Sequence, residues 1–164
     1  MIKSLQRSLR MSGFDRRVAT ELMFDTSAMG DAVLLVGGIH ILIGLVASIR
    51  GGFFDIVGLL TAAIYGVAGW LILSFAVWIM GTRVLKATGD VQALMRGAGF
   101  GSLPLLLAVV GLGWIGTIWH LAVVVLVTKV VLGLEWKEAA GAVLLGAALV
   151  VLIQLLFRAP FLLL

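Results

Sequence analysis

The sequence predicts an all-α protein, a polytopic bundle of five transmembrane helices preceded by an amphipathic helix at the membrane interface. Apolar residues make up 62% of the 164 residues and charged residues only 12%, with a mean hydropathy of +1.22. A soluble domain has about a quarter charged residues on average, so this chain is predicted to fold in lipid. Its apolar residues also form uninterrupted runs that are long enough to cross a bilayer.

Residues 1–31 form the one long stretch of mixed polarity. Apolar residues such as Ile2, Leu5 and Leu9 recur there near helical spacing, with basic residues between them, which is typical of a helix in the membrane interface. A partly ordered, solvated tail is the alternative. Because basic residues beside a membrane domain are drawn to its surface, the net charge of +4 needs no nucleic-acid partner. The residues expected to contact the membrane surface are Arg7, Arg10, Arg16 and Arg17.

The first two apolar runs predict spans over residues 32–49 and 56–80. The first run has 18 residues without an acid, lysine or arginine, and Arg50 follows it. The second has 25 residues without a formal charge and lies between Asp55 and Arg83. At about 1.5 Å per residue, the first run just covers a hydrocarbon core of about 30 Å and the second covers it with tilt.

The third apolar block runs from Gly97 to Leu134 and is too long for one crossing. We expect it to fold back near Gly111 and Gly113, which predicts spans over 99–112 and 114–134, followed by a fifth over 139–157. A re-entrant loop in place of the span over 99–112 is the alternative. The membrane domain would thus cover residues 32–158, with a short tail over 159–164.

The distribution of lysine and arginine predicts the orientation. With a cytoplasmic N-terminus and five spans, ten basic residues fall on the cytoplasmic side and two on the other. We therefore expect the N-terminus in the cytoplasm and the C-terminus on the opposite side.

The glycine-rich stretch "RGAGFGSLPLLL", residues 96–107, superficially resembles a phosphate-binding loop, but the strand and helix that such a loop requires are missing. Small residues four apart instead predict close helix packing in lipid, where van der Waals contact dominates association. Three such pairs are the predicted packing positions: Ala62 with Gly66, Gly97 with Gly101, and Ala142 with Gly146.

His40 and His120 are the two histidines, and both fall inside predicted spans. Each is a candidate ligand for a haem or a chlorophyll-type pigment. With the predicted bounds they lie roughly 12 Å and 21 Å from the cytoplasmic ends of their spans, which argues against one shared haem. A neutral histidine that hydrogen-bonds within the bundle is the favoured interpretation. The sequence predicts no metal site and no catalytic motif, so we expect a protein that is not an enzyme.

From Arg96 to about Phe157, and more loosely from Phe24, the chain resembles the Yip1-domain family of multi-span membrane proteins. The features that carry this resemblance are small residues before "LP" at 103–104, the bend "GLGWIG", the stretch "IWHLAVVVLVTKVVLGL" and the turn "EWKEAAGAVLL". The resemblance implies a cytoplasmic N-terminus and five spans. In eukaryotes it also implies association with Rab GTPases and vesicle traffic. The segment of about 31 residues before the first span is shorter than the cytosolic region of typical trafficking members, which argues against direct Rab binding.

The leading functional hypothesis is a non-enzymatic scaffold in a prokaryotic inner membrane that needs no cofactor. It would contact the lipid bilayer and associate through its helices with other membrane proteins or with copies of itself. One alternative is an accessory subunit of a respiratory or photosynthetic complex that holds a haem or pigment through His40 or His120. A second alternative is a small transporter or channel.

Overall fold

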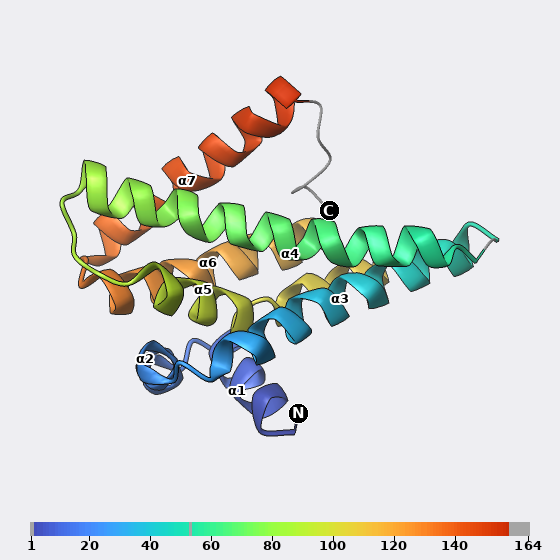
Figure 1. Cartoon of the computed structure of the whole chain (residues 1–164), viewed down its shortest axis with the longest axis horizontal. Coiled ribbons are helices and arrows are strands. Elements are labelled where there is room, and N and C mark those ends of the chain that lie inside the picture. Colours follow the sequence, from blue (N-terminus) through green and yellow to red (C-terminus); the bar gives the residue numbers. More distant parts are fainter. Residues whose placement is uncertain (1, 53, 158–164) are drawn as a thin grey trace.

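The computed structural model describes residues 2–52 and 54–157, and within these ranges the regular structure is helical throughout (Figure 1). Five stretches are long and apolar enough to cross a membrane. They are Ala28–Arg50, Ile56–Val84, Val91–Val110, Gly113–Leu132 and Trp136–Ile153. The prediction of an all-α, five-span bundle with helical structure before the first span is confirmed.

The N-terminal segment forms two helices where one was expected, α1 (Ile2–Ser12) and α2 (Arg16–Phe24). The chain turns between them at Phe14, which has a φ of 62°. Asp15 then caps α2, because its side chain accepts a hydrogen bond from the Arg17 backbone N–H at 2.9 Å. Both helices pack beside α5 and α6 (Figure 1).

The first two spans form an antiparallel hairpin of α3 (Ala28–Arg50) and α4 (Ile56–Ile79). The helix α3 begins four residues before the predicted start of the first span. The Asp55 side chain caps α4 by accepting a hydrogen bond from the Val57 backbone N–H at 3.0 Å. A π-helical turn, η1 (Met80–Val84), prolongs α4 beyond the predicted end of the second span.

The third crossing differs most from the prediction of 99–112. It consists of α5 (Val91–Phe100) followed by a 3-10 helix, η2 (Leu103–Val110), so it begins eight residues earlier. Asp90 starts α5 by accepting hydrogen bonds from the backbone N–H groups of Gln92 and Ala93. The early start was missed because Arg96, which marks a loop in the sequence, is buried inside the helical segment.

The last two spans are α6 (Gly113–Leu132) and α7 (Trp136–Phe157). Gly111 and Gly133 adopt φ values of 84° and 67°, a region that glycine enters without strain, and they terminate η2 and α6. The helix α7 packs against α4 and α6, and its C-terminal end leaves the bundle at an angle (Figure 1). The predicted tail over 159–164 lies outside the described residues.

The core is formed by the inner faces of α3, α4, α5, α6 and α7 together with the two N-terminal helices. Phe100, Leu94 and Val127 are fully buried there, together with Met11, Val18 and Leu22 of the N-terminal helices. The outer faces of the spans are apolar instead, with Leu34, Ile64 and Leu155 more than half exposed. Apolar groups on the outside of spanning helices are what lipid contact requires.

Candidate functional site

The third crossing is interrupted between Phe100 and Leu103, and three side chains satisfy the backbone carbonyls at this break. Ser8 Oγ donates a hydrogen bond to the Phe100 carbonyl at 2.7 Å, and Ser102 Oγ donates to the Gly99 carbonyl at 2.6 Å. His120 Nδ1 lies 2.9 Å from the Gly101 carbonyl. A helix end exposes carbonyls without intrahelical partners, which are costly in lipid, so these bonds make the interruption tolerable.

Ser8 belongs to α1, a helix with three faces of different chemical character. Ser4, Ser8 and Ser12 recur every four residues and are buried against the bundle, together with Met11. The Ser4 hydroxyl donates to Asp31 at 2.6 Å, and the Trp119 indole N–H donates to the Ser12 carbonyl at 2.9 Å. The other two faces are an exposed apolar face and a charged face, formed by Ile2, Leu5 and Leu9 and by Lys3, Gln6, Arg7 and Arg10.

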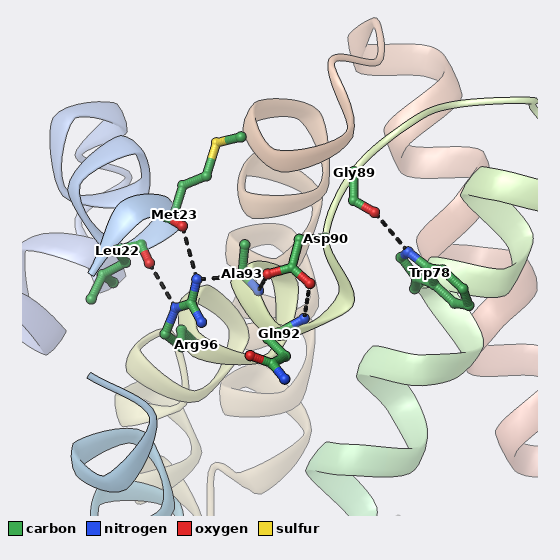
Figure 2. Close-up of polar contacts among 8 residues, drawn as sticks. All are labelled: Leu22, Met23, Trp78, Gly89, Asp90, Gln92, Ala93 and Arg96. Carbon is green, nitrogen blue, oxygen red and sulfur yellow. Dashed lines mark hydrogen bonds and ion pairs between the residues drawn. The ribbon is translucent and has the colours of Figure 1, made fainter. Parts of the chain in front are cut away.

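A buried arginine attaches α2 to α5, as Figure 2 shows. Arg96 is 2% exposed, and it donates from Nε to the Leu22 carbonyl at 2.9 Å and from Nη2 to the Met23 carbonyl at 2.8 Å. These carbonyls end α2, where the helix dipole is negative, so a cation is stabilised there. Asp90, which caps α5, lies 3.8 Å from the same guanidinium and is half exposed. Arg96, one of the ten basic residues counted for the cytoplasmic side, is therefore buried in the bundle rather than exposed in a loop.

The arginines expected at the membrane surface belong to the two N-terminal helices, but two of them are paired with acids. Arg7 lies 2.7 Å from Asp25, and Arg10 lies 2.7 Å from Asp15. Hydrogen bonds from Ser27 and then Arg7 lower the pKa of Asp25, and a hydrogen bond from Arg10 lowers the pKa of Asp15. Arg16 and Arg17 lie exposed on α2.

The two histidines lie at matching positions in their helices. His40 is twelve residues after the start of α3 at Ala28, and His120 is twelve residues before the end of α6 at Leu132. With these bounds the two residue counts are equal, so counting no longer places the histidines at different depths. In both rings Nδ1 faces a backbone carbonyl, of Val36 at 2.9 Å for His40 and of Gly101 for His120. This geometry leaves Nε2 as the nitrogen that could face a ligand.

The predicted packing glycines all lie against other segments of this chain. A Cβ on Gly66 would overlap the His40 ring, and one on Gly97 would overlap Val127. A Cβ on Gly101 would lie 2.6 Å from a methyl group of Val123, and one on Gly146 would lie 2.9 Å from the Val77 backbone nitrogen. Ala142 is fully buried, and Ala62 faces Gly44 of α3. Close approach at these glycines holds the five spans together.

One comparison with known proteins identifies a family. The family model described as Yip1 domain matches residues 17–158, which is most of the chain and includes all five spans. The chain belongs to the Yip1-domain family. No curated protein and no solved structure matches it. The helix α1 of this Yip1-domain protein lies before the matched residues, so the serine face that reaches the break is outside the region shared with the family.

Sequence reasoning missed two features of this Yip1-domain protein. The spacing of Ser4, Ser8 and Ser12 was visible as a signal, since small polar residues four apart predict a helix face that packs closely. The partner of Arg96 had no such signal, because backbone carbonyls 73 and 74 residues away accept its hydrogen bonds. Among the described residues, no three histidine or acidic side chains gather into a metal-ligating group.

Proposed function

We propose that this Yip1-domain protein is a non-enzymatic scaffold that associates with other membrane proteins or with copies of itself through the outer face of α3. We place it in a prokaryotic inner membrane with the N-terminus in the cytoplasm, as the distribution of basic residues favours. The family match supports a multi-span membrane protein, and the association is our proposal.

The observation that carries the proposal is a difference between two sets of glycines. One set packs closely against other helices inside the bundle and consists of Gly66, Gly97, Gly101 and Gly146. A Cβ on Gly30 or Gly38 of α3 would meet nothing within 4 Å, and the side chain of Leu34, between them on the same face, is 67% exposed. A glycine inside a helix costs roughly 0.5–1 kcal/mol relative to alanine, and among the described residues no close contact requires a glycine at these two positions. Close approach by a neighbouring helix would use them.

Cysteine cross-linking tests this association directly, because the natural chain has no cysteine. Leu34→Cys in native membranes is expected to give a disulfide-linked adduct, either with a second copy or with a partner that carries a nearby thiol. Phe75→Cys is the matched control, since Phe75 is also apolar and is 48% exposed on α4. To include partners without a thiol, a photoreactive residue at position 34 is compared with one at position 75. Adducts that form equally at both positions, or at neither, would contradict the proposal.

One observation favours the alternative of a haem or pigment subunit. The two histidines have matching positions in α3 and α6, and each presents Nε2 away from its carbonyl partner. An absorption spectrum of protein purified from its native membrane tests it. A visible band that is lost in both His40→Leu and His120→Leu would support a shared ligand and argue for an accessory subunit, whereas a colourless protein would remove this alternative.

A further inference from the structure

A cavity of about 430 Å³ lies between α1 and α2 and opens to the outside. It combines three cationic side chains, one carboxylate, one amide and one apolar side chain. The lining residues are Lys3, Gln6, Arg7, Leu9, Arg10 and Glu21. Its volume falls in the range of about 300–1,000 Å³ that is typical of small-molecule sites.

The charged groups of the cavity are only partly used within the protein. Arg7 and Arg10 each pair with an aspartate, and their side chains remain 34% and 50% exposed. A guanidinium carries five N–H donors, so each arginine keeps donors for a second acceptor. Lys3, Gln6 and Glu21 have no side-chain partner among the described residues. The cavity therefore offers several donors and one carboxylate acceptor.

The cavity lies on a helix that packs beside the membrane-spanning segments. The helix α1 is bound at the break in the third crossing by the Ser8 hydrogen bond, so it lies beside the spans. Leu9 lines the cavity and belongs to the exposed apolar face of α1, with Ile2 and Leu5. A headgroup site at a membrane interface needs this arrangement, with charges for the head and apolar side chains beside the acyl chains.

We propose that this cavity binds the headgroup of an aminophospholipid, with the phosphate on Lys3, Arg7 and Arg10 and the ammonium group on Glu21. Cationic side chains bind phosphate by charge-assisted hydrogen bonds, and a carboxylate accepts hydrogen bonds from a primary ammonium. A choline headgroup has no N–H to donate, and a glycerol headgroup has no cation. The site is thus expected to prefer ethanolamine over both, and it does not depend on the proposed association through α3.

Native mass spectrometry of the purified full chain in detergent tests this preference. Phosphatidylethanolamine, phosphatidylcholine and phosphatidylglycerol with identical acyl chains are titrated separately. We expect the ethanolamine lipid to bind about tenfold more tightly than the other two, which is the effect of one charge-assisted hydrogen bond. Equal retention of the choline lipid, or stronger retention of the glycerol lipid, would overturn the assignment of Glu21 to the ammonium group.

Two substitutions separate the two halves of the site. Glu21→Gln is expected to remove the preference for ethanolamine over glycerol, and Lys3→Gln to weaken binding of all three lipids about tenfold. Glu135→Gln and Arg83→Gln are the matched controls, because they change the same charges at exposed positions away from the cavity. Because Lys3 and Glu21 are exposed, neither variant is expected to unfold the protein. Variants that bind all three lipids like their controls would refute the site.

Discussion

Replacing Arg96 with methionine tests whether one buried arginine holds the N-terminal helices onto the bundle. Methionine keeps an unbranched side chain but removes both hydrogen bonds to the carbonyls that end α2, which measure 2.9 Å and 2.8 Å. Hydrogen bonds of charged groups contribute about 1.5–3 kcal/mol each. The substitution also removes the desolvation cost of a buried cation. We therefore expect the attachment of α2 to lose about 3 kcal/mol, the lower end of the sum for the two hydrogen bonds.

The loss is expected to loosen α2 locally and to leave the spans folded. Val18 and Leu22 of α2 remain buried against the bundle, and the spans keep their own glycine contacts. Trypsin cleavage at Arg16 and Arg17 reports the detached population when opening is fast relative to cleavage. At a factor of ten per 1.4 kcal/mol, a loss of about 3 kcal/mol raises cleavage about a hundredfold.

The assay compares initial cleavage rates in lipid nanodiscs at neutral pH. Arg83→Met is the matched control, because Arg83 is exposed and remote from α2. Circular dichroism of each variant shows that helix content is kept. A cleavage rate for Arg96→Met within about twofold of that for Arg83→Met would refute the argument that Arg96 attaches α2.

Three other contacts, two of the N-terminal segment and one between spans, can be tested in the same way. Gly146→Ala is expected to lower the melting temperature in detergent by about 4–8 °C, because its Cβ would lie 2.9 Å from the Val77 backbone nitrogen. Gly141→Ala on the same helix is the control, because its Cβ would meet nothing within 4 Å, and it should lower the melting temperature by less than about 2 °C. Equal shifts of the two variants would contradict this prediction. Ser8→Ala leaves the Phe100 carbonyl without its hydrogen bond, at a cost of about 1–3 kcal/mol, so amide exchange in α1 should speed up more than in Thr20→Ala, whose hydroxyl is exposed. The pKa of Asp25 is lowered from 3.8 in the folded state, so the contribution of Asp25 to stability is present above that value and is lost as the pH falls through the lowered pKa. Protection of the N-terminal helices from an acid-active protease such as pepsin should therefore decline below about pH 4, and it should decline less in Asp25→Asn.

The spans were predictable because lipid requires long apolar runs, and these are a local property of the sequence. The first, second and fifth runs each coincide with a helix to within a few residues. The third did not, because its start depends on the Asp90 cap and on Arg96 being buried by α2. Because the crossing starts earlier, its first helix, α5, packs against both α3 and α6.

The small-residue pairs show the limit of sequence patterns differently. Gly97, Gly101 and Gly146 were selected correctly as positions of close approach, but the sequence does not say which helix approaches. Only the three-dimensional arrangement separates glycines that face Val127, Val123 and Val77 from glycines such as Gly38 that face outward. The hydrogen bond of Ser8 was harder still to predict from the sequence, because its acceptor is a backbone carbonyl 92 residues away.

The attachment of α1 and α2 has a consequence for biosynthesis. These helices are translated before the spans, and the groups that hold them, from Arg96 to Trp119, are translated 74 to 107 residues later. At a translation rate of about 5–20 residues per second, the residues that bind the N-terminal helices are synthesised on the order of ten seconds after those helices. During that interval the apolar side chains of both helices, including those that are buried in the finished protein, are exposed to water. The nearby membrane surface can shield them. Mutations that slow insertion of the third and fourth spans should therefore expose this early segment to proteases and chaperones in the cell.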